Sequence, residues 1–218
     1  DTINKTNRIA SGISSSQPTV TFTDNNIGGA DVVGDVNNNY FYVVIAVDGG
    51  GNMSKNSNRV GEYDVDLKST PQTSFNLVAG PVGGEDITTA SQLLEAIPNC
   101  DGVAYWDAEK QGYVDYVPVV RDFSVTRGYP YYVNVTADAI WTTAGALTTP
   151  IFNLIKTEST SFNTITVPLD KVYITKASEL LADIPNCDGV SYWDAEKQGY
   201  VDYVPFVRDF PVKVGRAY

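Results

Sequence analysis

The sequence predicts a mainly β fold, in which each of two repeated modules carries one short helix. Three observations support this class. Aromatic and β-branched residues gather in short runs, Gly, Pro, Asn and Asp separate these runs, and the chain repeats itself after residue 72. Because hydrophobic residues make up 43% of the 218 residues, packed cores are expected. We predict three consecutive modules, at residues 1–66, 73–141 and 151–218.

The first module contains a strand and a loop of a known type. Residues 40–58 read YFYVVIAVDGGGNMSKNSN. This segment resembles the last two strands of the fibronectin type III domains of secreted bacterial and archaeal proteins, in which a YxYxVxAVD strand precedes GNxSxxSN. The matching residues are Tyr40, Tyr42, Val44, Ala46, Asp48, Asn52, Ser54, Ser57 and Asn58. The resemblance covers residues 1–66, has one additional glycine within 49–51, and implies a partial fibronectin III-like sandwich without its first strands.

The strand expected at residues 40–47 is apolar along both of its faces. Its even-numbered residues would face the sandwich core, and its odd-numbered residues form a second apolar row. Because one face of an antiparallel sheet is commonly polar and solvated, we predict that another module or chain covers this second row.

An internal repeat organises the remainder of the chain. Residues 73–131 align without a gap with residues 160–218, at a shift of 87 positions. Within this alignment, residues 97–123 and 184–210 differ at only two positions. These are Ala104/Ser191 and Val119/Phe206. Either recent duplication of this block or a binding or assembly surface shared by both copies explains such concentrated similarity, and the two repeats are expected to superpose.

Each repeat is predicted to begin with a strand and a short helix. The first β-type runs are residues 75–79 and 162–167. In residues 88–97, Thr89 and Gln92 have the spacing of a capping box, and Pro98 ends the helix.

A hairpin is expected after the helix, with strands at residues 103–106 and 113–120 joined by a loop that ends in glycine. Residues 131–135 form the last predicted strand of the first repeat. The second repeat stops at Tyr218, the counterpart of Tyr131, so this module lacks that strand. Residues 67–72 and 142–150 are the expected linkers.

Charge and composition exclude several classes of function. A net charge of −11 argues against a nucleic-acid partner or an anionic membrane surface, because either would repel the chain. The absence of histidine removes imidazole bases, Ser-His and Cys-His pairs and most zinc sites. No apolar run approaches the roughly 20 residues of a membrane span. Catalysis by carboxylates alone, as in glycosidases, would need a cleft. The candidate pairs, Asp107/Glu109 and Asp115/Asp122, lie in short hairpins, so we predict that the protein is not an enzyme.

Aromatic and polar residues of the repeated hairpin form the strongest candidate for a ligand site. An aromatic plane beside carboxylate and amide groups suits sugar binding, so a glycan-binding platform is one interpretation. Its residues are Trp106, Asp107, Gln111, Trp193, Asp194 and Gln198. The other interpretation is core packing, since strand alternation places Trp106 on the same face as Ala104.

The sequence also contains candidate thiol, metal and glycosylation sites. Cys100 and Cys187 are equivalent residues of separate modules, too far apart for an intrachain disulfide. Two buried free thiols are therefore favoured over an intrachain bridge, and a disulfide between two chains is the alternative. Calcium could bind acidic and amide groups, but the absence of a DxDxDG loop favours turn formation, and no cofactor is predicted. The Ca²⁺ candidates are residues 24–26, residues 31–39, and Asp101 with Asp107. The glycosylation candidates are Asn4, Asn52 and Asn134.

These observations together predict an extracellular or cell-surface protein. Only 19% of its residues are charged, and 14 Tyr and 18 Gly are present. We predict a structural or adhesive segment of a surface, sheath or filament protein. Its expected partners are other copies of itself or other parts of a longer chain, joined through β-strand edges. The alternative is a carbohydrate-binding accessory region of a secreted polysaccharide-degrading enzyme, with glycans as partners.

Overall fold

The computed structural model describes residues 10, 11, 13, 21–24, 34, 39–83 and 87–218. These residues form a mainly β structure with two short helices, as the sequence predicts. The elements, in chain order, are β1 (Phe41–Tyr42), β2 (Val60–Leu67), β3 (Phe75–Val78), β4 (Val82–Gly83), α1 (Ala90–Ala96), β5 (Cys100–Asp107), β6 (Gly112–Asp115), β7 (Tyr131–Val135), β8 (Ala139–Leu147), α2 (Ala177–Asp183), β9 (Ser191–Asp194) and β10 (Gly199–Asp202).

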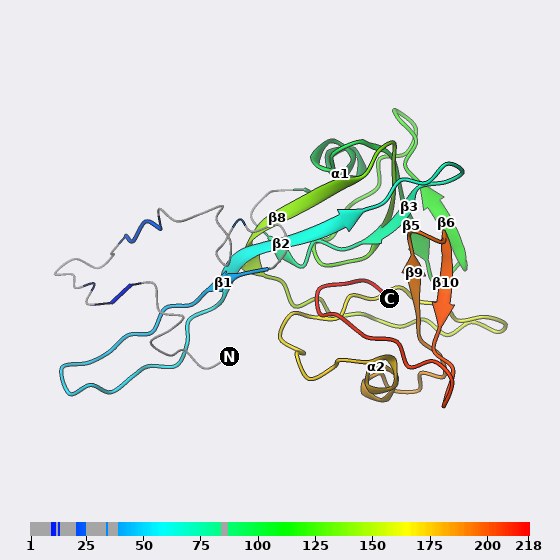
Figure 1. Cartoon of the computed structure of the whole chain (residues 1–218). Coiled ribbons are helices and arrows are strands. Elements are labelled where there is room, and N and C mark those ends of the chain that lie inside the picture. The colour runs from blue at the N-terminus through cyan, green and yellow to red at the C-terminus, as the bar shows by residue number, and fades with distance from the viewer. Residues whose placement is uncertain (1–9, 12, 14–20, 25–33, 35–38, 84–86) are drawn as a thin grey trace.

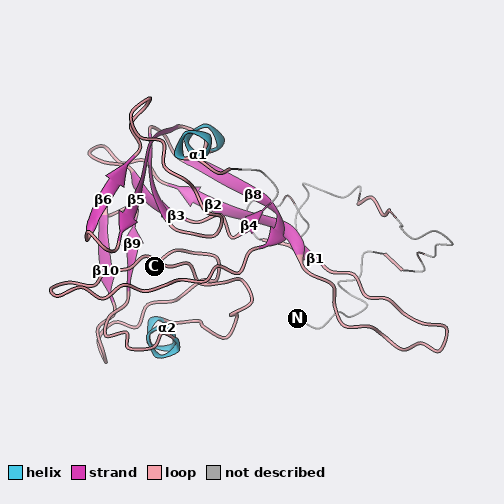
Figure 2. Ribbon diagram, turned by 180° about the vertical axis from the view of Figure 1, so that it is seen from behind, coloured by secondary structure: helices cyan, strands magenta, loops and turns pink. Residues whose placement is uncertain are grey.

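All strand pairs in the described part of the chain are antiparallel and form three sheets (Figures 1 and 2). One sheet has the order β1-β2-β8-β4, a second has the order β3-β7-β5-β6, and β9 pairs only with β10. Strand β2 pairs along its whole length with β8. Strand β2 ends the predicted first module, and β8 follows β7 of the first repeat. The two modules therefore share one continuous sheet across the predicted boundary at residue 66.

Helix α1 forms for the reasons that the sequence indicates. The side chain of Thr89 accepts a hydrogen bond from the backbone of Gln92, and Gln92 bonds back to the N-cap backbone, which completes the predicted capping box. Ala90 and Leu93 are buried against β5 and β7. The counterpart α2 begins after Lys176, which makes no side-chain cap.

Each repeat has its own hydrophobic core beneath its helix. The first includes Leu93, Val103 and Val133, and the second includes Leu180 and Val190. A smaller cluster of Tyr63, Val82 and Leu169 lies between them. There, the Tyr63 hydroxyl donates to the carbonyl oxygen of Val214 at 2.9 Å. The N-terminal sheet and the second repeat are therefore in direct contact.

The repeated hairpins have the same register, as predicted. Trp106 pairs with Tyr113 across β5 and β6, and Trp193 pairs with Tyr200 across β9 and β10. The strand predicted at residues 131–135 is confirmed as β7, but it is not the last of its module, because β8 follows it from Ala139. In contrast, β6 ends at Asp115, well before the predicted residue 120, because the chain turns after Val117.

The prediction that residues 40–47 form one strand covered on both faces is wrong. Only Phe41 and Tyr42 belong to a strand, and Val44 and Val47 are 70% and 60% exposed. The segment forms an open hairpin with residues 53–58, which extends away from the sheets in Figure 1.

Two serines explain why this hairpin is irregular. The hydroxyl of Ser57 accepts a hydrogen bond from the Val44 N–H at 2.8 Å, and that of Ser54 accepts from the Ala46 N–H at 3.0 Å. Side chains thus replace backbone carbonyls as acceptors for one strand, and a regular ladder does not form.

Two further sequence expectations also need correction. Residues 142–147, expected as part of a linker, continue strand β8, because residues 142–146 pair with β2 and Leu147 pairs with Val82 of β4. Residues 162–167, expected as a strand, form only a short ladder in which Ile165 and Tyr218 exchange two backbone hydrogen bonds of 2.9 and 2.8 Å.

Candidate functional site

Two glutamines join the repeats to each other through backbone groups. The Gln111 side chain accepts from the Phe162 N–H at 2.8 Å and donates to the Phe162 carbonyl at 3.0 Å. Gln198 makes the same two contacts with Phe75, at 2.9 and 3.0 Å. Each glutamine amide therefore pairs with an extended backbone as a neighbouring strand residue would.

The two tryptophans reinforce this exchange. The indole N–H of Trp106 donates to the Phe162 carbonyl at 2.8 Å, and that of Trp193 donates to the Phe75 carbonyl at 2.7 Å. Each contact from the first repeat to the second is matched by an equivalent contact from the second repeat to the first. The interface is therefore isologous, as in a two-fold symmetric dimer. We call these two matched sets of residues, Trp106, Gln111 and Phe162 with Trp193, Gln198 and Phe75, the inter-repeat clamp.

Tyrosines occupy the centre of this interface. The Tyr113 and Tyr200 hydroxyls, which are equivalent in the two repeats, lie 3.4 Å apart. The Tyr132 hydroxyl contacts that of Tyr200, and its ring packs edge-on against Trp193 at 6.1 Å. Burial raises the pKa of both Tyr132 and Tyr200, so these two hydroxyls stay protonated at ordinary pH.

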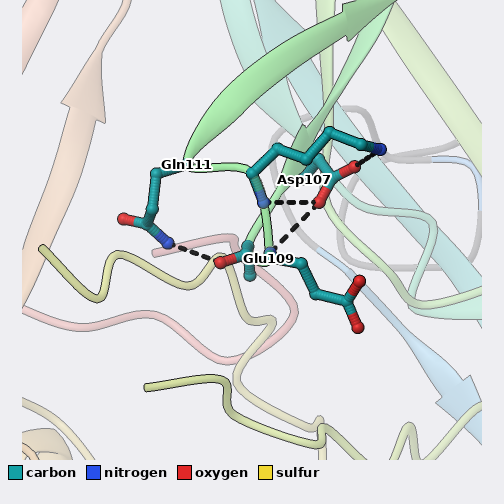
Figure 3. A network of polar contacts seen from close by, with 5 residues as sticks. Asp107, Glu109 and Gln111 are labelled. Carbon is teal, nitrogen blue, oxygen red and sulfur yellow. Dashed lines mark hydrogen bonds and ion pairs between the residues drawn. The ribbon is translucent and has the colours of Figure 1, made fainter. Parts of the chain in front are cut away.

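The hairpin turn positions each glutamine. Asp107 accepts from the backbone N–H groups of Glu109 and Lys110 at 3.1 and 3.0 Å, and from the Lys110 ammonium (Figure 3). These bonds hold the pKa of Asp107 below its usual value. Gln111 follows with φ of 50°, in the left-handed region, and its side chain also donates to the Ala108 carbonyl at 2.7 Å.

The structure gives all six predicted glycan-binding residues a partner within the chain. The tryptophans and glutamines belong to the inter-repeat clamp, while Asp107 and Asp194 organise their turns. Sequence reasoning missed Phe75 and Phe162, because they contribute backbone atoms rather than side chains. It also missed Tyr132, whose role arises from a contact with the other repeat. The one feature of the sequence that could have indicated these two residues is that both repeats have phenylalanine at this aligned position.

A pocket of about 400 Å³ lies beside Trp106. Aromatic residues from the first repeat and a loop of the second repeat line it. They include Tyr105, Phe123, Tyr129 and Phe152, and two asparagines, Asn153 and Asn163, contribute amide groups. This volume is within the usual range for sites that take small ligands.

The remaining candidates have separate positions. Cys100 and Cys187 are both free thiols, as expected, but they are half-buried rather than buried, and burial raises the pKa of Cys100. Asp101 and Asp107 lie near opposite ends of β5, about 20 Å apart at the usual rise per strand residue, too far to share one ion. Among the described residues, no three acidic, thiol or imidazole groups gather as a metal site. Asp24 accepts from the Tyr42 hydroxyl, while residues 25, 26, 31–33 and 35–38 lie outside the described residues.

The three glycosylation candidates also differ. Asn52 is exposed in the 47–53 loop and bonds to Asp48. Asn134 is half-buried in β7, where its amide nitrogen, the atom that a glycan would modify, donates to Asp101 at 2.6 Å. Asn4 lies outside the described residues.

Comparison of the chain with protein-family models, with curated proteins and with solved structures finds no match in any of the three. Within the described part of the chain, no helix is long and apolar enough to cross a membrane.

Proposed function

We propose that the protein is a structural or adhesive segment of an extracellular surface, sheath or filament assembly. The observation that carries this proposal is the inter-repeat clamp. The side chains best suited to hold a soluble ligand instead hold the two repeats together through six hydrogen bonds of 2.7 to 3.0 Å. A module stiffened by such contacts suits a role in transmitting force.

The composition supports an extracellular location for this role and argues against catalysis. The chain has few charged residues and many Tyr, Thr, Asn and Gly residues. Among the described carboxylates, Asp107, Asp122 and their counterparts Asp194 and Asp209 accept hydrogen bonds that hold turns or the first turn of a helix. Those bonds lower the pKa of all four groups, opposite to what a general acid requires.

The fibronectin III-like resemblance of residues 1–66 is part of the same proposal. Ser54 and Ser57, which belong to the matching motif, make the bonds that close the 40–58 hairpin. Asp48 and Asn52, also in the motif, bond to each other at the hairpin end. Residues of the matching motif thus hold the 40–58 hairpin together, and other strands of a longer chain or of another copy would complete it through its edges.

Stretching single molecules from their two ends tests the mechanical role. We expect the two repeats to unfold together in one event, because the inter-repeat clamp couples them. In the Gln111→Ala, Gln198→Ala double variant, we expect two events at lower force. The Gln72→Ala variant, altered in an exposed loop, serves as the control. Independent unfolding of the two repeats in the wild-type chain would contradict the proposal.

A carbohydrate-binding role is the second candidate, and the pocket beside Trp106 favours it. Its aromatic walls and two asparagines offer the stacking surfaces and polar groups that sugars need. A glycan array distinguishes the candidates. Saturable binding that is lost in Tyr129→Ala, which changes the pocket without changing the inter-repeat clamp, would support the carbohydrate role.

A further inference from the structure

Two equivalent tyrosines meet across the inter-repeat interface. Tyr113 lies in β6 and Tyr200 lies in β10, and these strands lie one above the other at the same side of the molecule (Figures 1 and 2). Their hydroxyl oxygens are 3.4 Å apart, although the residues are 87 positions apart in the chain. This distance is longer than an ordinary O–H···O hydrogen bond, so other contacts must keep the two phenols together.

Neighbouring aromatic rings supply those contacts. Trp106 packs edge-on against Tyr113 at 5.0 Å, and Trp193 packs edge-on against Tyr200 at 5.1 Å. Each indole N–H is in turn bonded to the backbone of the other repeat. Tyr132 packs against the Tyr113 ring at 4.9 Å, and its hydroxyl contacts that of Tyr200. The two phenol rings are therefore held beside each other in the folded chain.

Solvent exposure distinguishes this pair from the third tyrosine of the cluster. Tyr113 and Tyr200 are 50% and 48% exposed, whereas Tyr132 is 3% exposed. Tyr132 also belongs to β7, which is paired on both sides, so its ring has little freedom to turn. An oxidant in the surrounding solution would reach Tyr113 and Tyr200 first.

We propose that Tyr113 and Tyr200 form a modification site, at which a peroxidase with hydrogen peroxide joins them as a dityrosine. Each phenol loses one electron and one proton and becomes a tyrosyl radical. The two radicals couple through a carbon–carbon bond between their Cε atoms, and proton transfer from those carbons to the oxygens restores both phenols. Overall, two C–H bonds break, one C–C bond forms, and one hydrogen peroxide is reduced to two molecules of water.

The preformed arrangement explains why these two residues would couple selectively. Holding two reacting groups side by side converts an encounter between molecules into a reaction within one molecule. Coupling occurs at the carbon next to the one that bears the hydroxyl group, and the two hydroxyls are already in contact. Coupling within the chain is therefore expected to be faster than coupling between two chains.

The cross-link would make the association of the two repeats permanent. It would join β6 to β10 and close a loop between Tyr113 and Tyr200, which restricts the unfolded chain as a disulfide does. The hydrogen bonds of the inter-repeat clamp can break under force, whereas this bond would hold. The inference rests on the extracellular structural role in the proposed function, because a secreted peroxidase would supply the oxidant there.

Treatment of the intact 218-residue chain, at low concentration, with a peroxidase and hydrogen peroxide tests the proposal. Dityrosine fluorescence reports the product, and mass spectrometry of its peptides identifies the joined residues. We expect a monomeric product in which the Tyr113 and Tyr200 peptides are joined with the loss of two hydrogen atoms. Its yield should exceed that of any other tyrosine pair by at least about tenfold.

Three variants and one denatured sample serve as controls. Tyr113→Phe and Tyr200→Phe should each abolish the 113–200 product, because phenylalanine has no phenol to oxidise. Tyr173→Phe, which changes a 63% exposed tyrosine of the second repeat, should leave its yield unchanged. In urea, where the two phenols are no longer held together, the yield should fall by at least about tenfold.

Four results would overturn the proposal. They are the absence of dityrosine in the folded chain, coupling of Tyr132 in place of Tyr113 or Tyr200, products joined only between chains, and an equal yield of the 113–200 product in urea. Each can occur while the two repeats still unfold together under force. Failure of this inference is therefore distinguishable from failure of the proposed function.

Discussion

The two repeats contain nearly the same hairpin, yet equivalent residues are in different environments. In the first repeat, β5 is a strand of eight residues between two neighbours, whereas β9, its counterpart, has four residues and one neighbour. The local sequences are almost identical, so the difference arises from β7, which pairs with residues 100–104 and has no counterpart in the described second repeat. Strand length and burial are therefore set by the neighbouring strand more than by the local sequence.

The largest expected difference concerns Leu67 and Leu154, which keep the shift of 87 positions just before the aligned repeats and are 1% and 43% exposed. Leu67→Ala should lower the free energy of unfolding by about 2–5 kcal/mol, because it removes a fully buried side chain. Leu154→Ala should change it by no more than about 0.5 kcal/mol, as at other exposed positions. Urea unfolding of the two variants measures both values. Equal losses would show that the second repeat is as complete as the first.

The inter-repeat clamp is the feature in which the repeats should behave alike. Gln111→Ala and Gln198→Ala should each lower the free energy of unfolding by about 1–2 kcal/mol, because each removes two hydrogen bonds to a phenylalanine backbone. Thermal or urea unfolding measures this, with Gln72→Ala as the control. Clearly unequal losses would contradict the two-fold symmetry of the interface.

The two repeats also differ in how their helices are capped, and this difference should have a smaller effect on the free energy of unfolding. Lys176 has the extended backbone of an N-cap residue but makes no side-chain cap, and Glu179 occupies the third helical position. Lys176→Thr should complete a capping box and raise the free energy of unfolding by about 1 kcal/mol. Lys156→Thr, at an exposed loop position, is the control. Thr89→Ala in α1 should cause a loss of similar size, and no change in either variant would refute this account of the caps.

The smallest expected effect is at the turn after each hairpin. Val119 and Phe206 have φ of 66° and 62°, in the left-handed region, and both side chains are fully exposed. Glycine at either position should raise the free energy of unfolding by about 0.5–1 kcal/mol, because it relieves the steric strain of that conformation. Val120→Gly, next to the strained residue, should instead cause a small loss. Differential scanning calorimetry is sensitive enough to test the sign.

Sequence reasoning succeeded where the signal is local. The capping box of Thr89 and Gln92, the hairpin in which Trp106 ends one strand and Tyr113 begins the next, and the strand at residues 131–135 all follow from neighbouring residues. The free thiols followed from the equivalence of Cys100 and Cys187.

The inter-repeat clamp could not be predicted in the same way. Gln111 and Phe162 are 51 positions apart in the chain, and no local pattern links a side-chain amide to a distant backbone. The prediction of a strand at residues 40–47 was wrong for a related reason. Their apolar alternation indicated a strand, but the serines of the facing segment take the place of backbone acceptors.

Amide hydrogen exchange, compared between equivalent segments of the two repeats, tests the central claim most directly. That claim is that one scaffold is complete in the first repeat and lacks its central strand in the second. The account predicts slow exchange for the amides of residues 101–104 that face β7, and exchange at least about 100-fold faster for their counterparts in residues 188–191. Equal protection of the two segments in the chain alone would contradict it.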